Sequence, residues 1–349
     1  MDIALLKKTL QDHFTDGLAI IIGSGLSAAY GLPTMWALEK HLRTIVPTLI
    51  PDTLKGQWAD VEARLAAGRG LELALQDVYV SSELERIIVK ATGDFVAEKE
   101  IEAISKRLLS GQLFPFANLL KKAILPIIPS DGLPVISTNY DRLIEYAIES
   151  TGTAVNSLFH GHMWGTLDPK SSKDALVDKV HPIRRNNYVV RYRPHVNVYK
   201  PHGSLDWFEY QDSPIRCPLS LNAPRLIITP GSGKYRKGYE KAFETHRAQA
   251  NDAIEKASRY LIIGYGFNDD HLETRLRTEI KKGKSCVLLT MGLTANSKQV
   301  TEAYPNVLAV TRYDTGSEQG TEAFQSGNTY RFPGINIWNL EDFVKEVYL

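Results

Sequence analysis

The chain has 349 residues, of which 43% are hydrophobic and 23% are charged. A chain of this length can bury enough apolar surface to fold without a disulfide or metal staple, and its composition excludes a mainly disordered protein. The 41 Lys and Arg residues balance 40 Asp and Glu residues. The net charge of +1 therefore gives no overall attraction to a polyanion, which disfavours a dedicated nucleic-acid-binding protein.

Cysteine usage and hydropathy indicate the compartment. The two cysteines, Cys217 and Cys286, are too few for a disulfide framework or a four-thiolate zinc site, so we expect a reducing, cytoplasmic location. Charges interrupt residues 1–14, which excludes the apolar core of a signal peptide and favours a short amphipathic helix. The longest apolar run, residues 18–22, is far shorter than the roughly 20 residues that span a bilayer, so no membrane insertion is expected.

Strands and helices are expected to alternate from the start of the chain. Residues 18–23 are predicted to form a buried strand, because a short β-branched run ends in glycine. Helical periodicity then continues almost throughout residues 36–128. A second buried strand at 133–138 leads into a helix at 141–150. Residues 151–195 are rich in His, Gly and Pro and are expected to form an irregular insertion, either a loop or a small subdomain.

The second half of the chain continues this pattern. The expected strands are residues 196–200, 225–229, 260–264, 285–290, 307–310 and 335–338. The expected helices are residues 239–257, 269–280, 293–303 and 340–348, and residues 314–329 are expected to be a polar loop. The alternation predicts an α/β fold with a Rossmann-like parallel sheet and flanking helices. Because residues 36–128 are too long for a crossover, we expect an inserted helical subdomain within a single domain, 1–349.

A glycine-rich segment, GSGLSAAYGLPTMW, follows the first strand at residues 23–36. A strand that ends in Gly23 and Gly25 and leads into a helix presents backbone N–H groups and the positive end of a helix to a phosphate. The same pattern also fits a tight turn without a ligand. An ordinary dinucleotide fold needs an acidic residue after the next strand, about 20 residues on. That region is helical here, which argues against a dehydrogenase.

Four segments in this order resemble the sirtuin-like family, and within it the bacterial NAD-hydrolysing proteins of anti-phage defence. They are GSGLSAAYGLPT (23–34), STNYDRLIEYA (137–147), YKPHGSLDW (199–207) and LIIGYGFNDDHL (261–272). The resemblance implies a sirtuin-like catalytic domain with NAD as its substrate, cleaved to nicotinamide and ADP-ribose. Protein-deacylating sirtuins carry two paired-cysteine zinc motifs that this sequence lacks. We therefore expect no zinc ribbon and no bound metal, and water rather than an acyl-lysine as the acceptor.

The resemblance also implies roles for individual residues. Asn139 would hold the ribose and the attacking water, Asp141 would face the nicotinamide amide, and His202 corresponds to the family's catalytic histidine. The other residues implied to bind NAD are Gly23, Ser24, Gly25 and Ser27 at the pyrophosphate, Pro33 and Thr34 over the nicotinamide ribose, Thr138 beside Asn139, and Gly264, Tyr265 and Gly266 at the adenosine half.

The chemistry of these side chains is compatible with the implied reaction. Nicotinamide leaves readily as a neutral molecule, so the enzyme has to hold the ribose, stabilise an oxocarbenium-like state and position a nucleophile. Asparagine supplies a donor and an acceptor without charge, and a neutral histidine accepts a proton near pH 7. Purely structural roles remain open: Asn139 as a cap or turn residue, Asp141 as a first-turn acid of the next helix, and His202 as an exposed turn residue. Asp269 and Asp270 are expected to begin the helix at 269–280.

The sequence shows no sensor domain, so control by oligomerisation or by a partner is expected. By resemblance, a homo-oligomer with a HerA-type ATPase is the expected assembly, with an Argonaute-type partner second. The basic segment 181–195 contains Arg184, Arg185, Arg191 and Arg193 and could meet nucleic acid or an acidic partner, but an exposed, charge-guarded hairpin edge is the preferred interpretation. An NAD-dependent deacylase or ADP-ribosyltransferase, and a non-catalytic NAD or ADP-ribose sensor, are the alternative functions.

Overall fold

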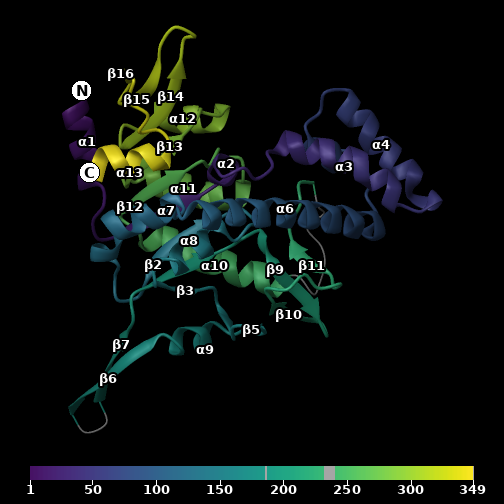
Figure 1. Cartoon of the computed structure of the whole chain (residues 1–349), viewed down its shortest axis with the longest axis horizontal. Helices are drawn as coiled ribbons and strands as arrows, with labels where there is room; N and C mark the ends of the chain where they lie inside the picture. Colours follow the sequence, from purple (N-terminus) through teal and green to yellow (C-terminus); the bar gives the residue numbers. More distant parts are fainter. Residues whose placement is uncertain (185–186, 232–239, 349) are drawn as a thin grey trace.

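A nine-stranded sheet is the centre of the computed structural model, which describes residues 1–184, 187–231 and 240–348 (Figure 1). In sheet order, the strands are β16 (Asn328–Pro333), β15 (Gln319–Gln325), β14 (Val307–Asp314), β13 (Ser285–Thr290), β12 (Arg259–Ile263), β1 (Leu18–Ile22), β2 (Leu133–Ser137), β8 (His195–Tyr199) and β3 (Ala154–Asn156). All pairs from β14 to β3 are parallel, and β14–β15 and β15–β16 are antiparallel. The predicted Rossmann-like sheet is confirmed.

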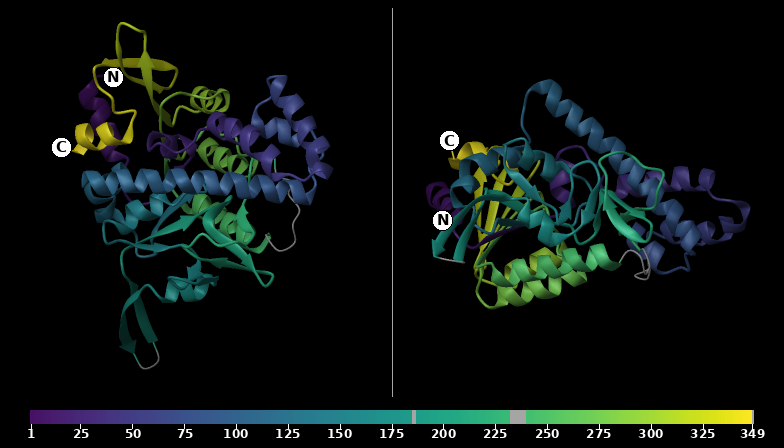
Figure 2. Two further views of the ribbon diagram at one scale, coloured as in Figure 1. Left: turned by 45° about the vertical axis from the view of Figure 1, so that its right-hand side comes forward. Right: turned by 90° about the horizontal axis from the view of Figure 1, so that it is seen from below.

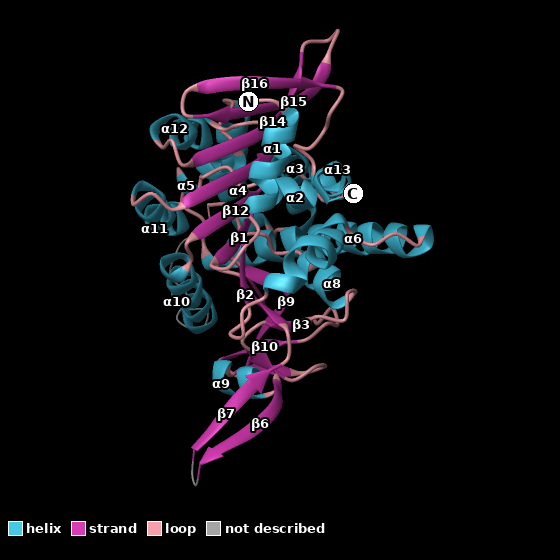
Figure 3. Cartoon of the chain, turned by 90° about the vertical axis from the view of Figure 1, so that its left-hand side faces the viewer, coloured by secondary structure: helices cyan, strands magenta, loops and turns pink. Residues whose placement is uncertain are grey.

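Helices cover both faces of this sheet, as Figure 3 shows. One face carries α10 (Glu240–Lys256), α11 (Asp270–Lys281) and α12 (Ala295–Ala303). The other face carries α1 (Ile3–Asp12), α7 (Pro115–Leu119), α8 (Leu143–Glu149) and α13 (Leu340–Tyr348). The flanking helices expected from the alternating pattern are thus present.

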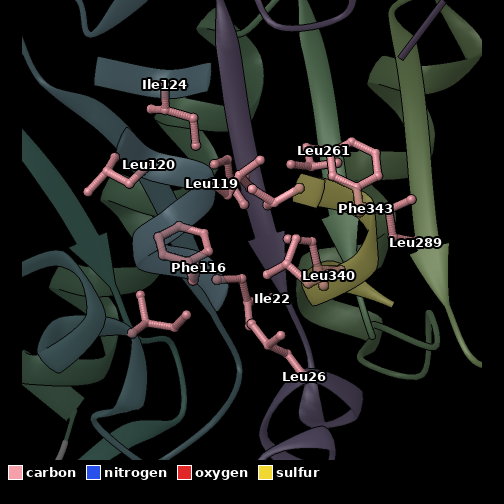
Figure 4. Close-up of a cluster of buried hydrophobic side chains, with 14 of the residues drawn as sticks. Ile22, Leu26, Phe116, Leu119, Leu120, Ile124, Leu261, Leu289, Leu340 and Phe343 are labelled. Carbon is pink, nitrogen blue, oxygen red and sulfur yellow. The ribbon is translucent and has the colours of Figure 1, made fainter. Parts of the chain in front are cut away.

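Strand β1 shows why its sequence is apolar throughout. Its side chains alternate between two cores: Leu18, Ile20 and Ile22 point to one, Ala19 and Ile21 to the other. A parallel strand that is buried on both faces needs such an uninterrupted run. Figure 4 shows Ile22 among side chains of α7 and α13, namely Phe116, Leu119, Leu340 and Phe343.

The inserted helical block has a core of its own. After the short helix α2 (Ser24–Ala29), it contains α3 (Met35–Leu49), α4 (Lys55–Ala66), α5 (Leu71–Gln76) and α6 (Ser82–Ser110). Leu42, Trp58 and Leu84 belong to this separate core, whereas Val96 and Ala103, further along α6, pack into the core of the main sheet. The 29-residue helix α6 therefore ties the helical block to the sheet (Figure 2). No strand interrupts residues 36–128, all of which are described, as the sequence predicts.

The prediction of an irregular insertion at 151–195 is wrong. Besides β3, this segment contains β4 (Phe159–His160), β5 (Gly165–Leu167), α9 (Pro169–Asp174), β6 (Val177–Arg184) and β7 (Asn187–Tyr192). Strands β4 and β5 complete a second sheet with β9 (Gly203–Tyr210), β10 (Ser213–Arg216) and β11 (Arg225–Ile227), in the order β11-β9-β10-β5-β4. Strands of two or three residues are too short to show periodicity, and β5 pairs with β10, about 50 residues further along the chain.

Strands β6 and β7 form a two-stranded antiparallel hairpin that projects from the body of the molecule (Figures 1 and 3). This confirms the hairpin interpretation of the basic segment 181–195. Arg191 and Arg193 are exposed there. Arg185 lies outside the described residues, and the side chain of Arg184 is not described either.

The end of the chain differs from expectation. The predicted polar loop at 314–329 is largely the antiparallel hairpin β15–β16, and the predicted strand at 335–338 is a turn before α13. In β15, which lies between β14 and the edge strand β16, buried Thr321 and Ala323 alternate with the less buried Glu322 and Phe324, and the strand resembles a loop in composition. The apolar residues that suggested a strand at 335–338 include Ile337, which is buried in the core although it lies in a turn. Among the described residues, none of the helices is both long and apolar enough to span a membrane.

Candidate functional site

A cavity of about 680 Å³ lies beyond the carboxyl ends of the central strands. In the sheet, β1 lies between β2 on one side and β12 on the other. The strand order therefore runs outward in opposite directions from β1, and the winding direction changes here. Such a switch point is where open α/β sheets bind ligands. Polar residues reach the cavity from four strand ends: Ser24 after β1, Asn139 after β2, His202 after β8 and Asp269 after β12.

Most residues that the sequence assigned to NAD line this cavity. They are Ser24, Ser27, Pro33, Thr34, Thr138, Asn139, Asp141, His202, Tyr265 and Gly266. The structure therefore brings together segments that are widely separated in the chain. The far wall comes from the helical block, with Leu38, Glu72, Glu85 and Val89.

Asn139 connects the loops that follow β1 and β2. Its Nδ2 donates hydrogen bonds to the carbonyl oxygen of Gly23 (2.9 Å) and to Oγ of Ser27 (2.7 Å). Both amide hydrogens are therefore used by the protein, which leaves Oδ1 to accept a hydrogen bond from any ligand in the cavity. Asn139 is no helix cap, because α8 begins at Leu143 with Arg142 as its N-cap.

Asp141 continues the same hydrogen-bonded chain. Its Oδ2 accepts a hydrogen bond of 2.6 Å from Oγ of Ser27, and its Oδ1 accepts one of 3.2 Å from the backbone N–H of Leu143. Burial raises the pKa of Asp141 to about 6, although the nearby ammonium of Lys200 acts in the opposite direction. This carboxyl group is therefore buried, fixed at both oxygens and able to hold a proton in mildly acidic solution.

Lys200 is a site residue that sequence reasoning missed. It is almost fully buried at the end of β8, and its Nζ lies 3.0 Å from Oε1 of Glu145 and 3.1 Å from Oγ of Ser204. The same Nζ donates to the carbonyl oxygens of Tyr140 and Asp141. Lys200 thus attaches the loop of Asn139 to β8. The one sequence signal that could have identified Lys200 is its position directly after an apolar strand.

His202 faces an acidic partner that the sequence did not assign to it. Nε2 of His202 lies 2.8 Å from Oδ2 of Asp269, and both side chains are largely buried. Asp269 also stands at the start of α11, as expected, with Oδ1 accepting from the N–H of Leu272 at 3.5 Å. The paired Asp residues after β12 were the only sequence signal, and they also fit a helix start. The side chain of Asp270 is not described.

The glycines Gly23, Gly25 and Gly264 are absent from the cavity lining and approach one another instead. The N–H groups of Gly23 and Gly25 donate to the carbonyl oxygens of Ile263 (3.0 Å) and Gly264 (2.9 Å). A Cβ atom on Gly25 would lie 2.8 Å from Cα of Gly264, which itself has a φ of +60°. Glycine is thus required for backbone contact between the β1 and β12 turns. The assignment of these three residues to NAD stays a prediction.

Arg247 of α10 is a second residue that sequence reasoning missed. Among the described cavity-lining residues it is the one Lys or Arg, in a wall that also contains Glu72, Glu85 and Glu244. Arg247 also lines an adjoining cavity of about 120 Å³ together with His202 and Asp269. In the part of the chain that is described, no group of three or more His, Cys, Asp or Glu side chains is placed to hold a metal ion.

Comparisons with known proteins point to one family. Residues 134–290 match the model of a family described as SIR2-like domain. The chain is similar to solved structures titled "Structural Basis for the Mechanism and Regulation of Sir2 Enzymes" (11% identity, TM-score 0.43, 86% of this chain and 90% of that one) and "Sir2-p53 peptide-NAD+" (12% identity, TM-score 0.38, 85% and 90%). It is also similar to Sir2Tm bound to a propionylated peptide (11% identity, TM-score 0.41, 83% and 89%). No curated protein sequence matches.

Proposed function

We propose that this protein is an NAD+ hydrolase that cleaves the bond between nicotinamide and ribose. The observation that carries the proposal is the convergence of Asn139, Asp141 and His202 on one cavity at the switch point of the sheet. The match of residues 134–290 to a SIR2-like domain supports it, because that range contains all three residues. The volume of about 680 Å³ lies within the range of cavities that hold cofactor-sized ligands.

The proposed reaction uses water as the acceptor. The oxygen of water forms a bond to the anomeric carbon of the ribose, and the bond from that carbon to the nicotinamide nitrogen breaks with its electron pair. Nicotinamide leaves as a neutral molecule, and the proton of water passes to His202 and then to solvent. Oδ1 of Asn139 accepts a hydrogen bond from the ribose or from the water, since both of its N–H groups are engaged.

The biological setting of the proposal rests on the four motifs in the sequence. We place the reaction in anti-phage defence, where it depletes NAD in an infected cell. A toxic activity of this kind has to be controlled, and we propose control by self-association and by a protein partner. A HerA-type ATPase is the first candidate partner and an Argonaute-type protein is the second.

The lining of the cavity favours one second candidate function, transfer of the ADP-ribosyl group to an acceptor larger than water, either a protein side chain or an acyl-lysine. Besides His202, the lining includes Ile228 and Thr229, after β11, and residues of the helical block. A cavity of about 680 Å³ with this lining has room for an acceptor larger than water. An ADP-ribosyltransferase or deacylase activity is therefore the alternative to hydrolysis.

Product analysis tests the proposal. The purified protein is incubated with NAD, alone and with each candidate partner, beside the variants Asn139→Ala and His202→Ala. We expect nicotinamide and ADP-ribose from the wild type and a loss of roughly 10²–10⁴-fold in rate for His202→Ala. His160→Ala and Asn328→Ala change exposed residues outside the cavity lining and serve as matched controls. Binding of NAD without cleavage under every condition would instead identify a sensor, and ADP-ribosylated or deacylated protein would identify a transferase.

A further inference from the structure

The contact between His202 and Asp269 bears on which nitrogen of the imidazole takes part in the reaction. The 2.8 Å distance joins Nε2 of His202 and Oδ2 of Asp269. A neutral imidazole has one N–H donor and one acceptor nitrogen, and the partner of one nitrogen decides which of them carries the proton. An ionised carboxylate only accepts hydrogen bonds. Asp269 therefore favours a proton on Nε2 and leaves the lone pair on Nδ1.

The carboxylate is fixed in place by the start of α11. The backbone oxygen of Asp269 accepts from the N–H of Glu273 at 2.8 Å, and its Oδ1 accepts from the N–H of Leu272 at 3.5 Å. The other oxygen, Oδ2, is the one that lies against His202. Because a helix terminus holds one oxygen, the second has a defined position relative to the imidazole.

His202 is held by backbone contacts of its own loop. Its carbonyl oxygen accepts a hydrogen bond of 2.9 Å from the N–H of Ile228, and the following residue, Gly203, has a φ of +85°. The imidazole and the carboxylate thus belong to different loops, one after β8 and one after β12, each with its own backbone anchors. Their exposed side-chain fractions are 24% and 12%, so water screens their interaction only in part.

We propose that Asp269 is a positioning residue for His202: its carboxylate, 2.8 Å from Nε2, favours a proton on that nitrogen and makes Nδ1 the nitrogen that receives the proton of the attacking water. This inference rests on the proposed function, since it names the partner of the same base. Asp269 also stabilises the imidazolium that forms when Nδ1 is protonated. Arg247 borders the same small cavity.

The variant Asp269→Asn separates this role from helix capping. Asn and Asp are comparable N-cap residues, so the start of α11 is preserved, whereas the anionic acceptor is lost. Asp168→Asn is the matched control, because Asp168 caps α9 with a hydrogen bond of 3.0 Å from the N–H of Ser171 and does not line the cavity.

The first test is independent of any activity. Nitrogen NMR of the protein labelled at its nine histidines reports the tautomer of each ring, and His202→Gln identifies the signal of His202. We expect a proton on Nε2 in the wild type and in Asp168→Asn, and a partial or complete change to Nδ1 in Asp269→Asn. An Nδ1 proton in the wild type, or no change in Asp269→Asn, would overturn the proposal.

The second test uses NAD cleavage. We expect Asp269→Asn to lower kcat by roughly 10²-fold, a typical contribution of an acid–base pair, with a KM within a few-fold of the wild type. In the His202→Ala background the same change should have almost no further effect, because the two residues act as a unit. Independent, multiplicative losses would overturn the positioning role. If the wild type cleaves no NAD, the proposed function fails, and the NMR result alone then decides whether Asp269 orients His202.

Discussion

Ser27 and Asp141 are joined by a hydrogen bond of 2.6 Å from the serine hydroxyl to the carboxylate, although 114 residues separate them in the chain. Asn139 donates to the same serine oxygen at 2.7 Å, so the three side chains form one chain across the β1 and β2 loops. The buried end of this chain is Asp141, with a pKa raised to about 6. The candidate site therefore contains an acid whose charged form is disfavoured by the fold.

Asp141→Asn should stabilise the protein at pH 8 and have little effect at pH 4. Burial raises the pKa of Asp141 from an ordinary 3.8 to about 6, so the folded state binds this proton more tightly than the unfolded state does. The cost to stability is absent below pH 3.8 and fully present above pH 6. We expect a gain of roughly 2–3 kcal/mol in the free energy of unfolding at pH 8, measured by urea denaturation.

Asp206→Asn is the control of opposite sign for this prediction. Asp206 is equally buried, but Arg216 and Arg142 outweigh the effect of burial and lower its pKa. Its contribution to stability is therefore present at neutral pH and is lost only as the pH falls through that lowered pKa. Asp206→Asn should destabilise the protein at pH 8. Equal effects of the two substitutions at pH 8 would contradict the assignment of Asp141.

Gly25→Ala should destabilise the protein and abolish NAD cleavage. The added Cβ would lie 2.8 Å from Cα and 2.9 Å from the carbonyl oxygen of Gly264, so the β1 and β12 turns would have to separate. Overpacking of this kind costs roughly 1–3 kcal/mol, which thermal or urea denaturation measures. Gly56→Ala in α4 is the matched control: a Cβ there meets nothing within 4 Å, and the change should stabilise the helix by about 1 kcal/mol.

Arg247→Ala should weaken NAD binding more than it slows the chemical step. The N–H groups of Gly23 and Gly25 are already bonded to β12, so Arg247 is the cation among the described lining residues that can pair with a phosphate. A charged hydrogen bond of about 1.5–3 kcal/mol corresponds to a rise in KM of roughly 10–150-fold. Steady-state kinetics at fixed ionic strength measures this rise, and Arg247→Lys should restore part of it. The control is Lys256→Ala, which changes an exposed residue at the end of the same helix. An unchanged KM in Arg247→Ala would exclude contact between Arg247 and the phosphates.

Sequence patterns predicted the buried strands, and the four motifs of the resemblance supplied part of the cavity lining. Strands β1, β2, β12 and β13 are short apolar runs because both of their faces are covered, and this property is local to each strand. The polar residues that follow them reach one cavity because parallel strands end at the same edge of a sheet. The strands of the outer hairpin, β15 and β16, and the short strands of the second sheet have no such local pattern, since their pairing partners stabilise them.

The sequence by itself thus determined the class of fold, the alternation of its central elements and the position of Asn139, Asp141 and His202 at strand ends. Only the tertiary structure decided which partners these residues meet. Asp269 reaches His202, Lys200 reaches the loop of Asp141, and Gly264 touches Gly25, because the order of strands in the sheet brings their loops together. Residues far apart in the chain carry no local signal of such contacts. Hydrogen bonds, burial and charge interactions depend on distances in space, and the folded sheet sets those distances.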